Sequence, residues 1–288
     1  MTTINPLRVK LPKTGTSIRT KSGMKYTIGT RISDMGGFGL LYNGLDTFGN
    51  PVAVKIFRPK GKFSEVQRQW RNETTILDRV RHPNVVFIHD AFIYNNLFYI
   101  IFERAWGNLN DLVNQDGSLE ELKVREIARQ LLFALHYIHK KNVLHKDLTA
   151  YNILYFKNGT AVLYKVSDFG ISEDFTNRCT DKSTNPIAHQ LFRPPELVKF
   201  GYTSIQSDLY HLGLILYYCL TGNFPYDITL PKAHIDKAII NGVPRQRAET
   251  LGTSFGDFIS VLLRRRSKYR YKTALEAWDD LQTILHNR

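Results

Sequence analysis

The hydrophobic pattern of the first hundred residues limits the possible folds most strongly. Residues 26–56 alternate apolar and polar positions around glycines, which predicts a strand, a Gly-rich turn and two further strands. Residues 64–81 have the spacing of an amphipathic helix. Residues 82–103 predict two more strands joined by the polar turn Asn95-Asn96. This half of the chain is therefore expected to be a small β-rich lobe with one main helix.

The pattern changes near residue 108, where helical spacing takes over. Long helical stretches are predicted at 119–140, 206–221 and 273–286, separated by polar loops that contain proline. The two halves together predict an α+β fold with two lobes, the second larger and mainly α-helical.

Composition excludes several classes of protein. With 288 residues, 43% of them hydrophobic, the chain can bury one large core or two modest ones. No apolar run approaches the roughly 20 residues that span a bilayer, so no transmembrane segment is expected, and the N-terminus lacks the apolar block of a signal peptide. Cys179 and Cys219 have neither paired nor zinc-site spacing. These features favour a reducing, cytoplasmic location.

The formal net charge is +13, and the N-terminus carries much of it. Seven cations precede the first acidic residue, Asp34, and all of them except Arg31 lie in residues 1–25: Arg8, Lys10, Lys13, Arg19, Lys21 and Lys25. We expect residues 1–25 to be a basic, flexible tail, for which simple solvation is the first interpretation. The alternative is an anionic partner, such as nucleic acid, lipid or an acidic protein.

Glycines lie at the tip of the first predicted hairpin. Gly36, Gly37 and Gly39 would let backbone N–H groups approach phosphate oxygens closely, although a plain tight hairpin has the same glycines. Lys55 ends the apolar run VAVK on the third strand, where a lysine needs a partner or must extend to the strand end. Glu73, on the following helix, is the expected partner.

The segment VLHKDLTAYNIL, residues 143–154, combines groups suited to phosphoryl transfer. A short predicted hairpin brings Asp168 of the sequence SDFG near Asn152, and these oxygens suit Mg²⁺. Asp147 is then left to act on a hydroxyl. For any one of these side chains, an Asx turn or loop cap is the alternative interpretation.

Taken together, the motifs from about residue 26 to 286 resemble a eukaryotic-type protein kinase domain. They occur in the family's order: DMGGFG, VAVK, Glu73, HPNVV, HKDLTAYN, DFG, RPPE, SDLYHLG and Arg270. The resemblance implies an N-lobe at 26–103, a hinge at 103–107 and a C-lobe at 108–288.

The resemblance also implies a role for each matching residue. Gly36, Gly37 and Gly39 would cover the phosphates of ATP, and Lys55, paired with Glu73, would contact the α- and β-phosphates. Asp147 would be the catalytic base, and Asn152 and Asp168 would hold Mg²⁺. The backbone of Glu103 and Ala105, after the gatekeeper Phe102, would bind adenine, and Asn108 would lie near the ribose.

Other matching positions imply structural roles. Glu196 would pair with Arg270, and Asp208 would hold the backbone of the catalytic loop. Leu77, Ile88, His145 and Phe169 would stack as an apolar column.

The chain departs from the family pattern at several positions. Asp34 replaces the first glycine of the phosphate loop, and Lys146 replaces the usual arginine. Thr149 stands where serine/threonine kinases carry a lysine, Tyr151 where many tyrosine kinases carry an arginine, and His189 where a threonine is usual.

The favoured function is an ATP-dependent protein kinase acting on Ser/Thr hydroxyls of protein substrates. Autophosphorylation is expected in the segment that carries Thr176, Thr180, Ser183 and Thr184, where a phosphate would pair with local cations and with Lys146. The alternative for this segment is a mobile polar loop with incidental hydroxyls. Two alternatives remain, a pseudokinase that acts as an interaction module and a kinase-like phosphotransferase for small molecules.

Overall fold

The computed structural model describes residues 10–33, 39–58, 62–174 and 192–286, and the chain divides into two compact units. The first unit comprises residues 1–81 and 86–105, and the second comprises 82–85 and 106–288. The boundary after Ala105 lies inside the predicted hinge.

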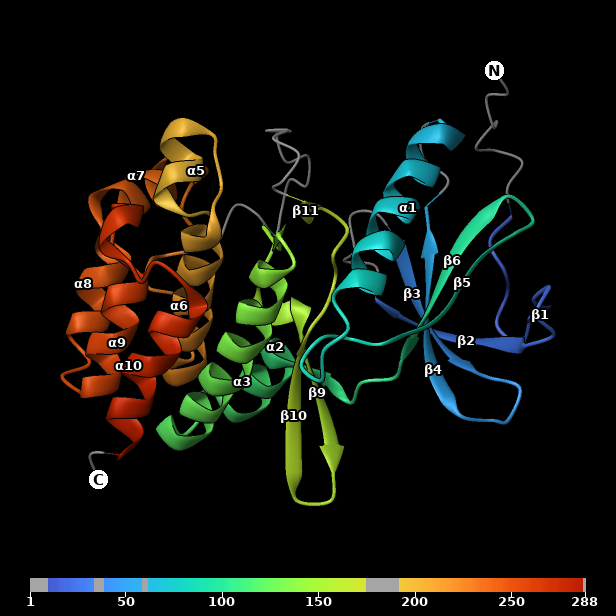
Figure 1. The fold of residues 1–288 in the computed structure, drawn as a ribbon, viewed down its shortest axis with the longest axis horizontal. Helices are drawn as coiled ribbons and strands as arrows, with labels where there is room; N and C mark the ends of the chain where they lie inside the picture. Colours follow the sequence, from blue (N-terminus) through green and yellow to red (C-terminus); the bar gives the residue numbers. More distant parts are fainter. Residues whose placement is uncertain (1–9, 34–38, 59–61, 175–191, 287–288) are drawn as a thin grey trace. The chain divides into compact units, whose positions relative to one another are not determined.

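In its described residues, the first unit is a six-stranded antiparallel sheet with one helix (Figure 1). Its strands run in the order β1-β2-β3-β4-β6-β5. The elements are β1 (Ser17–Arg19), β2 (Lys25–Ser33), β3 (Gly39–Leu45), β4 (Pro51–Phe57), α1 (Phe63–Arg79), β5 (Ile88–Tyr94) and β6 (Leu97–Glu103). Asn95 and Asn96 both have positive φ, 47° and 59°, as a two-residue hairpin turn requires. The five predicted strands and the helix are therefore confirmed.

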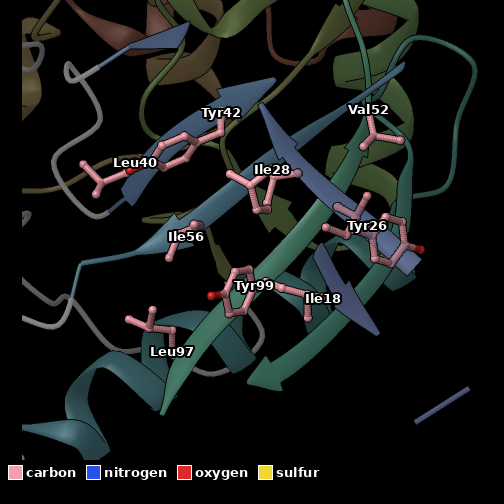
Figure 2. Close-up of a cluster of buried hydrophobic side chains, with 11 residues drawn as sticks. Ile18, Tyr26, Ile28, Leu40, Tyr42, Val52, Ile56, Leu97 and Tyr99 are labelled. Carbon is pink, nitrogen blue, oxygen red and sulfur yellow. The ribbon is translucent and has the colours of Figure 1, made fainter. Parts of the chain in front are cut away.

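Strand β1 was missed by the sequence prediction, which assigned residues 1–25 to a flexible tail. Residues 17–19 pair antiparallel with residues 25–27 of β2, and Ile18 is fully buried. Figure 2 shows Ile18 beside Tyr26 and Tyr99 in the core of this unit. Burial of this isoleucine holds the segment on the sheet, although one apolar residue between two polar ones gives no clear pattern in the sequence.

The pleat of β4 places its side chains on two different faces. Val52, Val54 and Ile56 point into the apolar cluster of Figure 2. Lys55 alternates with them and therefore points to the opposite face, in register with Ile100 of β6. That face is the one covered by α1, because Phe98 of β6 packs against Trp70 of the helix. The pleat thus directs Lys55 toward α1.

The second unit is mainly helical (Figure 1). Its helices are α2 (Leu109–Asp116), α3 (Glu121–Lys140), α5 (Pro195–Phe200), α6 (Ile205–Thr221), α7 (Lys232–Asn241), α8 (Val243–Glu249), α9 (Ser254–Leu262) and α10 (Ala274–His286), with the 3-10 turns η2 (Ala150–Asn152) and η3 (Ser267–Tyr269). Its strands are β7 (Gly107–Asn108), β8 (Val143–Leu144), β9 (Ile153–Asn158), β10 (Ala161–Val166) and β11 (Glu173–Asp174).

The three long helices predicted from the sequence are α3, α6 and α10. Helix α6 is buried from Ser207 to Cys219, in keeping with its apolar sequence. None of the helices in the described ranges is long and apolar enough to cross a membrane.

A buried ion pair joins two distant parts of this unit. Arg270 donates from Nη1 and Nη2 to Oε1 and Oε2 of Glu196, at 2.7 and 2.8 Å. Ser207 Oγ donates to the same carboxylate at 2.7 Å. Burial raises the pKa of Glu196, but the hydrogen bonds and charge of Arg270 outweigh this effect and leave the pKa below its usual value. The carboxylate is therefore ionised at neutral pH.

Replacing Arg270 with methionine is expected to destabilise the protein by about 3–5 kcal/mol, because Glu196 would remain buried without its cation. The midpoint of urea denaturation measures this loss. Arg245→Met is the control, since it removes the exposed pair with Glu249 and should cost less than about 1 kcal/mol. Equal midpoints for the two variants would contradict the predicted stabilising role of the buried pair.

Candidate active site

Lys55 and Glu73 form a short, bidentate ion pair in the first unit. Lys55 Nζ lies 2.7 and 2.8 Å from the two carboxylate oxygens of Glu73. Glu73 is fully buried, whereas 12% of the Lys55 side chain remains exposed. Helix α1 buries Glu73 on the same face as Val66 and Leu77. The pairing predicted from the sequence is therefore present, and it holds an ammonium group at the end of an otherwise buried stem.

Gly39 packs directly against this lysine. A Cβ at position 39 would lie 3.1 Å from Cγ and 3.2 Å from Cε of Lys55. The absence of a side chain at residue 39 therefore gives the lysine stem its room. The other two glycines predicted to approach phosphate, Gly36 and Gly37, lie outside the described residues, as does Asp34.

The predicted adenine-binding segment lies at the C-terminal end of the first unit. Glu103 is fixed by its side chain, since its Oε1 accepts the Phe87 N–H at 2.7 Å, and its own N–H donates to Phe87 O. Ala105 is 8% exposed, and no acceptor for its N–H occurs in the described part of the chain. Such a buried donor needs a partner, and a ligand acceptor would supply one.

Asn108 has a structural role that competes with the predicted contact to ribose. It is the N-cap of α2, and its Oδ1 accepts the Asp111 N–H at 3.0 Å. The Asp111 carboxylate accepts the Asn108 N–H in return, which completes a capping box. The amide nitrogen of the Asn108 side chain and one lone pair of its Oδ1 are left to contact a ligand.

The second unit brings Asp147, Asn152 and Asp168 to one place. Asn152 Nδ2 donates to the Asp147 carbonyl at 2.8 Å and lies 3.4 Å from its Oδ2. Strands β9 and β10 pair Ile153 with Val166, and Ser167 N donates to Asn152 O at 2.8 Å. The predicted hairpin therefore places Asp168 beside Asn152.

Asn152 and Asp168 offer oxygen donors that suit a hard cation. Because Nδ2 of Asn152 donates to Asp147, its Oδ1 remains as an acceptor, and the carboxylate of Asp168 follows directly after Ser167, whose N–H donates to Asn152 O. An amide oxygen and a carboxylate are ligands that suit Mg²⁺. In the described ranges no cluster of three or more His, Cys, Asp or Glu side chains could hold a metal ion. Two protein oxygens leave coordination positions that Mg²⁺ commonly fills with water or substrate phosphate.

Two residues of this site, Lys146 and Asp168, have strained backbone conformations. Lys146 and Asp168 have φ of 68° and 60°, in the left-handed region that ordinary side chains rarely adopt. Such strain persists only where surrounding contacts enforce it, and it concentrates at functional sites.

Asp208 of α6 enforces the conformation at Lys146. Its Oδ2 accepts the His145 N–H at 3.0 Å and its Oδ1 accepts the Lys146 N–H at 2.9 Å, as predicted. Burial raises the pKa of Asp208, but the hydrogen bond from His139 and the nearby imidazoles hold it at about 2. The carboxylate therefore stays charged and fixes the loop.

His145 connects this loop to the segment of Asp168. Its Nε2 lies 3.0 Å from Ser167 O, and its Nδ1 accepts the Asp147 N–H at 3.3 Å. Burial lowers the pKa of His145, so the ring is neutral, with the proton on Nε2. Its ring also packs edge-on against Phe169, at 4.8 Å between centroids. His145 and Phe169 are the members of the predicted apolar column that belong to the second unit. The other two members, Leu77 and Ile88, belong to the first unit.

Thr149 is 1% exposed, and its hydroxyl is buried without a hydrogen-bond partner among the described residues. Tyr151, in contrast, is 40% exposed. His189 and the four predicted phosphorylation sites, Thr176, Thr180, Ser183 and Thr184, lie outside the described residues.

The sequence analysis missed Ser172 and Glu173. Ser172 Oγ donates to His145 O at 3.1 Å, and the Glu173 carboxylate forms an ion pair with Lys146. Both contacts join residues 27 positions apart, so no local sequence pattern could have indicated them.

Comparison with known proteins matches the protein kinase domain family model to residues 27–280. The chain belongs to the protein kinase family. This agrees with the resemblance inferred from its motifs and with a β-rich unit followed by a larger helical one.

Several curated relatives of this kinase chain carry serine/threonine kinase names. It is 29% identical over 265 residues to a probable serine/threonine-protein kinase of Clostridium acetobutylicum, covering 88% of this chain and 39% of that protein. A probable serine/threonine-protein kinase of Clostridium perfringens is 30% identical over 239 residues, 81% of this chain and 34% of that protein. Serine/threonine-protein kinase 36 of Mus musculus is 30% identical over 247 residues, 85% of this chain and 18% of that protein. The chain thus spans well under half the length of these relatives.

A test of the glycine at position 39 follows from its contact with Lys55. In this kinase chain, Gly39→Val is expected to push the lysine stem away from Glu73, costing about 1–3 kcal/mol in overpacking and lowering turnover. Turnover and the thermal midpoint measure the two effects. Leu45→Val, at an exposed position of the same strand, is the control and should change neither. Wild-type behaviour of Gly39→Val would show that the lysine stem can relax without loss.

Proposed function

We propose that the chain is an ATP-dependent protein kinase that transfers the γ-phosphate to Ser/Thr hydroxyls of proteins. The observation that carries the proposal is that Asn152 contacts Asp147 with its side chain and, with its carbonyl, accepts the N–H of Ser167, the residue before Asp168, while Asp208 holds the backbone of Lys146 just before Asp147. The carboxylate of Asp147 can act as the base, and the amide oxygen of Asn152 and the carboxylate of Asp168 can bind the metal ion. Phosphoryl transfer needs both functions.

Each residue has a role that follows from its contacts. Asp147 accepts the proton of the attacking hydroxyl, and its position is supported by the Asn152 amide. Lys55, oriented by Glu73, binds the α- and β-phosphates of the substrate ATP. Gly36, Gly37 and Gly39 let the backbone cover those phosphates. The Glu103 carbonyl and the Ala105 N–H bind the adenine edge, and Asn108 borders the ribose.

Mg²⁺ is the cofactor implied by the family. Asn152 Oδ1 and the Asp168 carboxylate would hold it, and when bound it neutralises phosphate charge. The protein's part is to keep both oxygens in place, through the Asn152 bond to Asp147 and the backbone bond from Ser167.

The acceptor class rests on the serine/threonine kinase names of the relatives. The experiment that tests it offers Mg·ATP with peptide libraries that contain only Ser/Thr or only Tyr as hydroxyl residues, beside a panel of small-molecule alcohols. We expect phosphate on the Ser/Thr peptides. Transfer only to small molecules would favour a kinase-like phosphotransferase, and transfer only to tyrosine would overturn the assigned class.

The pseudokinase alternative is favoured by one observation, the buried hydroxyl of Thr149 at a position where related kinases place a cation. In the proposed enzyme that hydroxyl donates to the phosphate being transferred. Thr149→Val, which keeps the shape of the side chain, is expected to leave the free energy of unfolding unchanged or slightly higher, because it removes an unpaired polar atom. It is expected to lower turnover about tenfold, the effect of losing one hydrogen bond of at least roughly 1.5 kcal/mol to a charged group. Unchanged turnover would exclude the hydroxyl from the reaction.

The basic N-terminal residues and the location complete the proposal. Lys10, Lys13, Arg19, Lys21 and Lys25 are all exposed, and this supports an anionic partner for this end of the chain. Such binding should weaken steeply with increasing salt concentration.

A cytoplasmic location is proposed because the cysteines are few and lack paired spacing, and Cys219 is a buried free thiol.

A further inference from the structure

Lys146 lies next to the candidate base, and its backbone is not free to move. Its N–H donates to the buried Asp208 carboxylate at 2.9 Å, and its φ of 68° turns the chain sharply just before Asp147. Its side chain is 12% exposed, so the ammonium group is largely removed from water. A largely buried cation requires a counter-charge.

Glu173 supplies that charge from within the chain. Its carboxylate forms an ion pair with the Lys146 ammonium, and 23% of the Glu173 side chain is exposed. Its backbone belongs to β11, which pairs Glu173 with Leu144 and Asp174 with Val143 of β8. The preceding residue, Ser172, adds the hydrogen bond from its hydroxyl to His145 O. Three kinds of contact therefore join this segment to the start of the catalytic loop.

The ion pair changes what Lys146 can do for a phosphate. The sequence alone suggested that a phosphate on the segment of Thr176 to Thr184 would pair with Lys146. With Glu173 in contact, the pair has no net charge, and a phosphate carrying about −1.5 to −2 would also meet the negative charge of Glu173. At a separation of about 4 Å, such repulsion amounts to roughly 1–4 kcal/mol per pair of unit charges. Attraction to Lys146 is therefore largely cancelled.

We infer that Glu173 is a positioning residue of this kinase: it neutralises Lys146 and holds the catalytic loop in its active conformation without a phosphate on Thr176, Thr180, Ser183 or Thr184. The inference rests on the proposed kinase activity. Glu173 acts through Lys146 and the backbone of the loop and does not itself touch the reacting atoms.

The test compares turnover of four purified proteins on a Ser/Thr peptide. The variant with alanine at all four hydroxyl positions is expected to keep turnover within about twofold of wild type, the spread for substitutions that remove no used contact. Glu173→Gln is expected to lower kcat roughly 10- to 100-fold, the range for coupled pairs of charged groups, with the KM for ATP nearly unchanged. The swapped pair Lys146→Glu with Glu173→Lys is expected to regain most of the lost kcat.

Two controls separate positioning from folding. All assays are run well below the thermal midpoint of each variant, so that a lower kcat belongs to folded protein. Glu249→Gln makes the same chemical change in the exposed pair with Arg245 and should leave kcat unchanged.

The possible failures are distinct. An inactive wild-type protein would overturn the proposed function itself. An active wild type with an inactive four-alanine variant would overturn the inference alone, since phosphate on that segment would then be required. Full activity of Glu173→Gln, or a swapped pair as slow as Glu173→Gln, would also overturn it.

Discussion

Replacing Asp147 with asparagine is expected to reduce kcat by about 10²–10⁴-fold, the usual contribution of a positioned general base. The substitution keeps the size of the side chain. It also leaves the backbone carbonyl of residue 147, which accepts from Asn152 Nδ2 at 2.8 Å, so the loop should retain its conformation. Affinity for Mg·ATP should stay within a few-fold, because the base acts in the transition state and not in ground-state binding. Peptide phosphorylation and calorimetric titration with Mg·ATP measure the two quantities.

Lys140→Ala provides a control for general damage to this region, since Lys140 is an exposed residue at the end of α3 and is outside the proposed site. It should keep kcat near that of wild type. Normal turnover of Asp147→Asn would remove Asp147 from the role of base.

Replacing Lys55 with methionine is expected to have two large effects. Turnover should fall steeply, because positioning of the phosphates supplies much of the rate of phosphoryl transfer. The protein should also lose about 3–5 kcal/mol of stability, because Glu73 would stay fully buried without its cation. Kinetic assays and urea denaturation separate the two effects.

A second substitution distinguishes charge burial from catalysis. Adding Glu73→Gln to Lys55→Met should restore part of the stability, since a neutral amide costs less to bury than a carboxylate, but it should restore no activity. Arg81→Met is the control, because its partner Asp78 is exposed and the pair should contribute less than about 1 kcal/mol. Stability equal to wild type in Lys55→Met would contradict the account of the buried pair.

Some site residues could be predicted because their residue type does not fit the hydrophobic pattern around them. Lys55 stands in an apolar strand, and that conflict alone indicated a buried partner on α1. The hairpin of β9 and β10 was predicted from two short apolar runs, and its register pairs Ile153 with Val166, so that Asn152 and Ser167 meet at its open end. The hairpin at Asn95-Asn96 was recognisable because few residues other than asparagine and glycine adopt positive φ readily.

The contacts that escaped prediction depend on tertiary structure. Asp208 reaches His139 across 69 positions, and Glu173 reaches Lys146 across 27, so each depends on how α6 and β11 pack. Strand β1 has only three residues, too few for an alternating pattern to emerge.

The most direct test of the central claim is transfer of labelled γ-phosphate from Mg·ATP to a Ser/Thr peptide library by the purified chain. We predict transfer by the wild type, its loss when EDTA removes Mg²⁺, and its loss in Asp147→Asn. Binding of Mg·ATP without any transfer by the wild type would contradict the claim and identify the chain as a nucleotide-binding interaction module.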